Sequence, residues 1–371
     1  MKVAFISRAT LFTVPGGDTR QMVQTAKWLE MLGVYADIYR CDAAIPYEEY
    51  DLLHFFNITR PADIITHVQR SGKLFVVSPI YIEHTRANEQ GKGWLLRTVT
   101  NILPVDSIAY LKTIARWLKN GEKIVSPKYL LLGQKKAVQW ITDRSACLLP
   151  NSESEIKRFR NNYDLTPPYV VVPNGIDPDI DIPVSYDRGN RTTVVCMARY
   201  EPIKNQLRLI QALNDTSYQL QLYGKPAANH YKYYEQCKIT AASNVTVGGF
   251  LESDDLYAAY QHARVHVLPS YFETTGLSSL EAAVMGCNVV VTDKGDVRDY
   301  FGDNAWYCDP DDPASIKAAV DAAWQAPCNK EFQNYILQHY TWEKAAKKTL
   351  EAYSKVLPNH NSIKTPDAPF T

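Results

Sequence analysis

A chain of 371 residues suits two domains of ordinary size, each with its own hydrophobic core. The 40 Lys and Arg residues balance the 40 Asp and Glu residues, so the chain lacks the basic excess of a general nucleic-acid-binding protein, and we expect no nucleic-acid partner. The seven cysteines are scattered, form no CxxC pair and lie mostly in apolar runs, which excludes a disulfide framework and a structural zinc site.

The start of the chain and the lengths of its apolar runs bear on where the protein acts. Met1 leads directly into an apolar strand pattern, without the charged region and apolar stretch of a signal peptide. No apolar run approaches the roughly 20 residues that span a bilayer. We therefore expect a cytoplasmic protein.

Two series of short apolar runs, separated by helix-length segments, predict the strands of two sheets. The first series comprises residues 2–7, 34–39, 51–56, 73–78, 146–151 and 169–174. The second series comprises residues 192–198, 218–224, 244–249, 265–270 and 288–293. Because the runs are continuously apolar rather than alternating, they indicate parallel sheets covered by helices on both faces. The predicted fold class is α/β, with two Rossmann-like, doubly wound domains that face each other across a cleft.

Composition sets the predicted domain boundaries. Residues 177–190 are polar, bear prolines and show no periodicity, a pattern that predicts a linker. We therefore expect a first domain over residues 1–180 and a second over residues 181–340. A strong helical pattern covers residues 341–357, and residues 358–371 predict a disordered tail.

Ligand chemistry is expected just after the strands, because ligands of open α/β sheets bind beyond the carboxyl ends of the strands. After the first strand, Gly16 and Gly17 open a helix, and their lack of side chains would let a phosphate reach backbone N–H groups. An ordinary tight turn explains the two glycines equally well. The turn lacks the glycine fingerprint GxGxxG, which argues against a nicotinamide dehydrogenase.

Two cations follow the first strand of the second series. Arg199 ends that strand and Lys204 begins the next helix, and such cations repel each other unless an anion lies between them. A diphosphate would accept several charge-assisted hydrogen bonds there, each worth about 1.5–3 kcal/mol. Two solvated surface charges are the alternative.

The stretch 270–293 places two carboxylates, Glu273 and Glu281, around one strand-to-helix turn. Ser278 and Glu281 also fit the S-x-x-E pattern of a capping box, so Glu281 would then simply cap its own helix. A carboxylate equally matches the paired hydroxyls of a ribose. That interpretation puts Glu281 on the sugar of a nucleotide and Glu273 on a second polyol, and it explains both glutamates rather than one.

Several motifs, taken in chain order, carry a family resemblance: GG, PNGID (173–177), ARYEPIKN, GFLESDDLYAAYQHARVHVLPS and E-x7-E. Together they resemble the retaining glycosyltransferases of the GT-B fold, family four, over nearly all of residues 1–357. The resemblance implies that the C-terminal helix crosses back to the first domain.

The resemblance also implies roles for individual residues. Arg199, Lys204 and Glu273 would form the catalytic set, with the two cations on the donor diphosphate and Glu273 at the donor sugar. Glu281 would bind the ribose. The other donor-binding residues would be Gly16, Gly17, Asn174, Gly249, Phe250, Leu251, Thr274, Thr275, Gly276 and Leu277.

The sequence departs from the family pattern at two points. Many members carry a histidine shortly after the fourth strand, where this chain has Ile80. Either His84, four residues later, serves on the acceptor side from a shifted loop, or backbone groups take that role. The loop after Glu273 commonly reads E-x-F-G, and here Thr275 stands in place of the phenylalanine.

A D-x-D pattern in the predicted linker raises the question of a metal. Asp177, Asp179 and Asp181 repeat the manganese signature of the other glycosyltransferase fold, but aspartate is also common in turns beside prolines. Because Arg199 and Lys204 would neutralise the leaving diphosphate, we expect no metal. We also expect no cofactor, since the nucleotide-sugar is a co-substrate.

The segment 88–145 is long for a strand connection and carries ten basic residues against four acidic ones. Trp and Leu residues alternate with the basic ones, a pattern that suits an interfacial helix on anionic lipid. A solvated helical face over the core of the first domain is the alternative. The first interpretation adds a peripheral contact with the inner membrane face to the cytoplasmic location.

The combined expectation is a hexosyltransferase that acts with retention of configuration. It would move a sugar from a nucleotide-diphosphate donor to a hydroxyl of a glycan or glycolipid acceptor, in bacterial surface-glycan or glycolipid assembly. One alternative is a nucleotide-sugar epimerase on the same fold, which would need acidic and basic groups at the sugar carbon. Another is a non-catalytic carbohydrate-binding protein, which would leave the charged set without a use.

Overall fold

The computed structural model describes residues 1–82, 106–108, 110–111, 113–114, 127–178, 180, 191–227 and 229–358. The chain divides into two compact units. Unit 1 contains the described residues up to Asn174 together with the C-terminal segment from Trp342, and unit 2 runs from Gly175 to Thr341.

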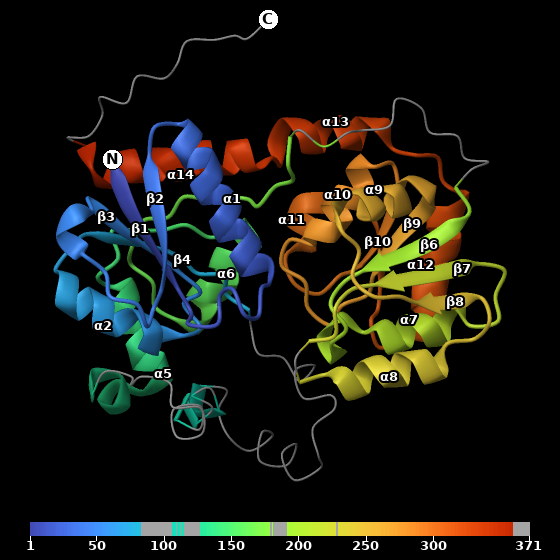
Figure 1. The fold of residues 1–371 in the computed structure, drawn as a ribbon, viewed down its shortest axis with the longest axis horizontal. Helices are drawn as coiled ribbons and strands as arrows, with labels where there is room; N and C mark the ends of the chain where they lie inside the picture. Colours follow the sequence, from blue (N-terminus) through green and yellow to red (C-terminus); the bar gives the residue numbers. More distant parts are fainter. Residues whose placement is uncertain are drawn as a thin grey trace, which may run out of the picture. The chain divides into compact units, whose positions relative to one another are not determined.

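Unit 1 is built on a five-stranded parallel sheet with the order β2-β1-β3-β4-β5 (Figure 1). Its strands are β1 (Lys2–Ser7), β2 (Tyr35–Arg40), β3 (Leu52–Phe56), β4 (Phe75–Ser78) and β5 (Cys147–Leu148). All residues of β3 and β4 are buried, as expected for inner strands covered on both faces. The first five apolar runs of the first series therefore predicted the strands of this sheet.

Helices cover both faces of the unit 1 sheet. They are α1 (Gly17–Met31), α2 (Pro61–Ser71), α5 (Pro127–Thr142), α6 (Glu153–Asn162) and α14 (Trp342–Val356). Helix α14 packs against α1, and α2 packs against α5. The ends of α2 follow from sequence, because Pro61 occupies the first turn and Gly72 adopts the left-handed conformation that closes a helix, with φ 61°.

A buried hydrogen bond joins helix α14 to the sheet of unit 1. The ring of His54, in β3, is hydrogen-bonded through Nδ1 to the Tyr353 hydroxyl at 2.7 Å and through Nε2 to Ser78 Oγ at 2.9 Å. Burial lowers the pKa of His54 to about 3, so its imidazole is neutral. The prediction that the C-terminal helix returns to the first domain is thus confirmed.

Unit 2 holds a six-stranded parallel sheet with the order β11-β10-β9-β6-β7-β8 (Figure 1). Its strands are β6 (Thr193–Met197), β7 (Gln219–Tyr223), β8 (Val245–Val247), β9 (Ala263–Leu268), β10 (Asn288–Thr292) and β11 (Trp306–Cys308). Its helices are α7 (Gln206–Leu213), α8 (Tyr231–Thr240), α9 (Ser253–His262), α10 (Leu277–Val284), α11 (Val297–Phe301), α12 (Pro313–Gln325) and α13 (Lys330–His339). Helix α7 packs against α8 and α12, and α10 packs against α13.

Two strand predictions differ from the structure. Residues 169–174 are not a strand: a single bridge joins Tyr169 to Leu148, and the segment runs beside β5 as an irregular edge. Prolines at both ends remove backbone donors, which restricts such a run to a sheet edge. Strand β11 was not predicted from the sequence.

Two further observations concern the cysteines and the helices. All seven cysteines are free, and burial raises the pKa of the Cys196 and Cys287 thiols to about 12. Among the described residues, no helix combines the length and the apolar character needed to cross a membrane.

Candidate active site

The order of strands in unit 2 defines where its ligand edge lies. The chain passes from β6 outward to β7 and β8, then returns to place β9 on the other side of β6. The strand order therefore reverses between β6 and β9, and ligands of such sheets bind at this reversal, beyond the carboxyl ends of the strands. The predicted residues of unit 2 follow β6, β8 and β9, so they all lie at this edge.

Lys204 and Glu273 form an ion pair across the strand reversal. Lys204 ends the short turn η4 (Pro202–Lys204) after β6, and Glu273 lies in the loop after β9. The ammonium Nζ donates to Glu273 Oε2 at 2.6 Å, and the two side chains are only 21% and 10% exposed. Because the pair is partly buried, dissolved salt screens it less than it screens a pair at the surface. The structure thus brings together two residues predicted as separate contacts.

The backbone of Glu273 is held by the loop that follows β10. Its N–H donates to the Lys294 carbonyl at 3.1 Å, and its carbonyl accepts the Asp296 N–H at 2.9 Å. Between these contacts Gly295 adopts φ +106°, and a Cβ there would lie 2.0 Å from the Glu273 carbonyl oxygen. Only glycine permits this approach.

Arg199 also has an acidic partner. Its Nη2 donates to Glu201 Oε1 at 3.0 Å, and its side chain is 38% exposed. Glu201 and Glu273 each neutralise one cation. Arg199 and Lys204 therefore need no outside anion to offset their mutual repulsion, contrary to the prediction from the sequence. Sequence reasoning missed Glu201, although it follows Arg199 by only two residues.

The loop between Glu273 and α10 presents backbone more than side chains. The Thr275 side chain is buried and its hydroxyl donates to the Tyr300 hydroxyl at 3.3 Å, so it is already engaged within unit 2. Gly276 precedes α10 with φ 69° and ψ 54°, a left-handed conformation, and Leu277 opens the helix. Contacts of Thr274 to Leu277 with a donor would therefore rest on backbone groups.

Glu281 does not take part in a capping box. The residue that caps α10 is Gly276, not Ser278, and no side chain caps the helix. Glu281 lies five residues beyond the cap, in the body of the helix, and is 4% exposed. The capping interpretation is wrong for this geometry, and the ribose interpretation stays a prediction.

The loops after β7 and β8 form an aromatic platform. Phe250 is 52% exposed, and the Lys225 ammonium lies 4.0 Å from the centre of its ring. Gly249, beside Phe250, faces open space, since a Cβ there would meet no atom within 4 Å. Leu251 is half-buried. Gly249 and Leu251, predicted to flank the base, are thus the chain neighbours of an exposed ring. Its partner Lys225 was not predicted from the sequence.

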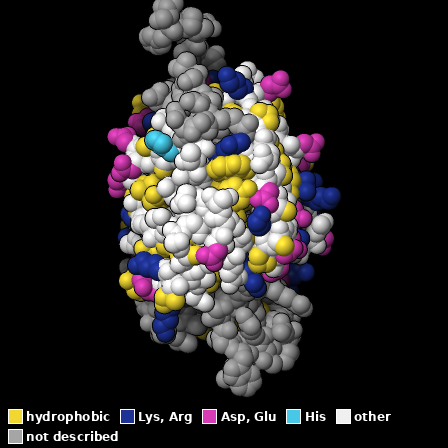
Figure 2. Space-filling model, turned by 90° about the vertical axis from the view of Figure 1, so that its right-hand side faces the viewer, with side chains coloured by type: hydrophobic (Ala, Val, Ile, Leu, Met, Phe, Trp, Pro, Cys, Tyr) yellow, Lys and Arg dark blue, Asp and Glu magenta, His cyan; other side chains and the backbone are white. Residues whose placement is uncertain are grey.

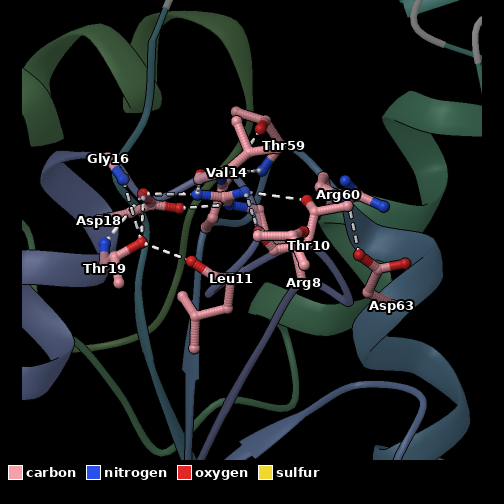
Figure 3. Close-up of polar contacts among 12 residues, drawn as sticks. Arg8, Thr10, Leu11, Val14, Gly16, Asp18, Thr19, Thr59, Arg60 and Asp63 are labelled. Carbon is pink, nitrogen blue, oxygen red and sulfur yellow. Dashed lines mark hydrogen bonds and ion pairs between the residues drawn. The ribbon is translucent and has the colours of Figure 1, made fainter. Parts of the chain in front are cut away.

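In unit 1, Gly16 and Gly17 lie at the N-terminus of α1, as predicted; Figure 3 shows Gly16 there. The Gly16 N–H already donates to Thr19 Oγ1 at 3.1 Å. The Gly17 N–H has no acceptor among the described residues, and a Cβ on Gly17 would meet nothing within 4 Å. Gly17, rather than Gly16, therefore offers an open amide at the positive end of the helix.

Arg8 holds the loop that leads to these glycines. Its guanidinium donates hydrogen bonds to both carboxylate oxygens of Asp18, at 2.7 and 3.0 Å, and to the carbonyls of Thr10 and Val14 (Figure 3). Sequence reasoning missed Arg8, whose one signal was its place directly after β1. Arg8 thereby neutralises Asp18, which lies in the first turn of α1, where a phosphate is predicted to bind.

The remaining predicted residues divide by position. Asn174 is buried and is the last residue of unit 1 before the chain enters unit 2. The next residue, Gly175, lies so close to Thr341 that a Cβ would be 2.3 Å from its carbonyl carbon, which gives the PNGID glycine a structural reason. His84, Asp179 and Asp181 lie outside the described residues, and no three His, Cys, Asp or Glu side chains within them are grouped as metal ligands.

Charges on the surface are mixed. On the face shown in Figure 2, the described Lys and Arg side chains are interspersed with Asp and Glu. A nucleic-acid-binding face would instead gather one sign of charge.

Residues 179–349 match the model of the family described as glycosyl transferases group 1. The O-antigen chain mannosyltransferase B of Escherichia coli is 30% identical over 110 residues, 28% of this chain and 29% of that protein. The chain spans less than a third of the length of the first curated relatives it matches, at 29% of each.

Solved structures match over almost the whole chain. Sucrose-phosphate synthase from Thermosynechococcus elongatus superposes with a TM-score of 0.72 at 15% identity, covering 97% of this chain and 100% of that one. An Anabaena protein solved in complex with UDP-glucose gives 0.67 at 15% identity, covering 96% and 100%. The predicted fold class is confirmed by these likenesses.

Proposed function

We propose that this chain, whose residues 179–349 match the model of the glycosyl transferases group 1 and whose fold is GT-B, transfers a sugar from a nucleotide-diphosphate donor to an acceptor hydroxyl. The observation that carries the proposal is the Lys204–Glu273 pair, a cation and a carboxylate joined at 2.6 Å at the strand reversal of unit 2. Such a pair offers one group to a leaving phosphate and one to a polyol.

The donor would lie along the carboxyl edge of unit 2. Lys204 and Arg199 would bind the diphosphate, Glu281 the ribose, and the exposed ring of Phe250 the face of the base. The interaction of the two cations with the diphosphate would strengthen as negative charge develops on the departing group. A donor-binding role of Gly17, in unit 1, stays a prediction. The UDP-glucose bound by the Anabaena protein makes UDP-sugars the first donors to test.

The reaction would proceed with retention of configuration and without a metal. The acceptor hydroxyl attacks the anomeric carbon from the face that the diphosphate leaves; the bond from carbon to phosphate oxygen breaks as the bond to the acceptor oxygen forms. The departing phosphate oxygen takes the hydroxyl proton. This route needs cations on the diphosphate more than a strong general base, which matches the set Arg199 and Lys204.

The acceptor would be a glycan or glycolipid reached at the cytoplasmic face of a membrane. Helix α5, in the described part of residues 88–145, exposes Leu131 at 87% and Leu130 at 38%. Gly133, with φ 68° and ψ −175°, kinks α5, and Lys135 and Lys136 are exposed just beyond this kink. Lys128 lies 4.2 Å over the ring of Trp140. Exposed leucines among lysines support docking on anionic lipid. His84 as an acceptor-side residue stays a prediction outside the described residues.

A thermal-shift screen of UDP-, GDP- and ADP-sugars tests the proposal, since a ligand at 100 times its Kd adds about 2.7 kcal/mol of stability. The sugar nucleotide that binds is then given candidate acceptors, and NMR of the product reads the anomeric configuration. Transfer with retention is expected. An inverted product, turnover to an epimerised donor, or binding without turnover would each contradict the proposal.

A further inference from the structure

The two oxygens of the Glu273 carboxylate have different surroundings. Oε2 accepts hydrogen bonds from Lys204 Nζ at 2.6 Å and from Ser270 Oγ at 3.1 Å. Oε1 accepts none from the described residues. It is also absent from the buried polar atoms that lack a partner, so it keeps contact with solvent. One oxygen is thus occupied by the protein, and the other is open.

Ser270 is itself rigidly placed. Its side chain is fully buried, with 0% exposure. The preceding residue, Pro269, accepts the side-chain amide of Asn205 at 3.1 Å, and the following residue, Tyr271, donates its N–H to the Ile203 carbonyl at 2.8 Å. Both anchors belong to the β6–α7 turn that also carries Lys204. The Ser270 hydroxyl therefore has a fixed position relative to both members of the ion pair.

The backbone of Glu273 is fixed as well, by its hydrogen bonds to Lys294 and Asp296. The remaining freedom of this residue is rotation of its side chain. Lys204 alone would restrain that rotation weakly, because its flexible chain presents a point charge that any carboxylate orientation can meet. The same ammonium would also turn toward a diphosphate. The serine hydroxyl supplies the second, directional contact.

We propose that Ser270 is a positioning residue, which holds Glu273 Oε2 so that Oε1 accepts a hydroxyl of the transferred sugar. This inference rests on the proposed function, because it names the part of the donor that Glu273 recognises. Ser270 would not touch the donor. Its removal would leave the Lys204 contact and the nucleotide part of the site in place while the carboxylate rotates.

Isothermal titration tests this with three ligand pairs: UDP and UDP-glucose, GDP and GDP-mannose, ADP and ADP-glucose. For the pair that binds, Ser270→Ala is expected to raise the Kd of the sugar nucleotide about tenfold, which is 1.4 kcal/mol, and to change that of the nucleoside diphosphate less than about twofold. Ser270→Thr, which keeps the hydroxyl, should restore most of the affinity. Ser279→Ala, which removes another fully buried hydroxyl of unit 2, is the matched control and should change neither Kd.

Equal losses for the nucleoside diphosphate and the sugar nucleotide would show a general disturbance of the loop and overturn the inference, as would no loss at all. If Ser270→Ala does not fold, Ser270→Cys carries the same comparison, because a thiol is a weaker donor. A wild-type protein that binds none of the three pairs overturns the proposed function itself. Binding by the wild type with an indifferent Ser270→Ala overturns only the role of Ser270.

Discussion

The ammonium of Lys204 and the carboxylate of Glu273 meet at 2.6 Å although 69 residues separate them in the chain. They meet because β9 returns to lie beside β6, so that the loops after these two strands share one edge of the sheet. A cation and an anion from different loops are thus fixed at the place where doubly wound sheets bind ligands.

Loss of the Lys204 ammonium should impair departure of the diphosphate. Lys204→Ala is expected to lower kcat/KM by about a hundredfold or more, since removal of one fixed charge from a developing oxyanion typically has this effect. Lys317→Ala removes a half-exposed lysine of α12, paired with Asp321, and serves as control. Steady-state assays with and without EDTA complete the test; activity should survive EDTA, and strict dependence on manganese would redirect attention to Asp177, Asp179 and Asp181.

Removal of the Glu281 charge should weaken nucleotide binding. Because Gly276, not Ser278, caps α10, Glu281→Gln is expected to raise the Kd of the nucleoside diphosphate with little change in Tm. Ser278→Ala should change neither quantity, whereas a true capping residue would lower stability by about 0.5–2 kcal/mol. Unchanged nucleotide affinity of Glu281→Gln would end the ribose assignment.

Gly295 should be intolerant of any side chain. Gly295→Ala adds a Cβ 2.0 Å from the Glu273 carbonyl oxygen and forces alanine to φ +106°. We expect a loss of at least about 2 kcal/mol in the free energy of unfolding, measured by urea denaturation. Gly249→Ala meets nothing within 4 Å and should cost less than about 0.5 kcal/mol. Similar midpoints for the two variants would contradict the close approach.

Acid should destabilise unit 1 through His54. The native state keeps this imidazole neutral because burial lowers its pKa to about 3, whereas the unfolded state binds a proton below its ordinary pKa of about 6.5. Stability is therefore unaffected by this group above about pH 6.5 and falls as the pH drops toward 3, by up to about 1.4 kcal/mol per pH unit. His54→Gln should flatten the slope of unfolding free energy against pH; the exposed His262→Gln should not. Parallel slopes for wild type and His54→Gln would refute the assignment.

Helix α5 should hold the protein on anionic vesicles. Replacing Lys128, Lys135 and Lys136 by alanine is expected to weaken binding to phosphatidylserine-containing liposomes by about 3 kcal/mol at low salt, near 1 kcal/mol for each charge. Donor hydrolysis should be unchanged, because these residues lie on α5 and not at the unit 2 edge. Replacing the exposed Lys344, Lys347 and Lys348 of α14 changes the charge equally and is the control. Equal binding by both triple variants and the wild type would return α5 to a solvated face.

Local patterns were enough to predict much of this protein. Apolar runs marked ten of the eleven strands in the described part of the chain, most clearly the inner strands, because those are buried on both faces whatever their partners are. Gly16 and Gly17 marked the start of α1, and the heptad-like apolar positions of residues 341–357 marked α14. These features depend on residues a few positions apart, so the sequence by itself determines them.

Tertiary structure decided which groups meet. Only the placement of β9 beside β6 pairs Lys204 with Glu273, and only the return of the β10 loop explains why residue 295 must be glycine. The same holds for Lys225 over Phe250, which lie after different strands. Such contacts depend on the order of strands in the sheet, and strand order is set by the packing of the whole unit rather than by any short stretch of sequence. The residue types of the site could therefore be predicted from the sequence, whereas the pairing of its charges could not.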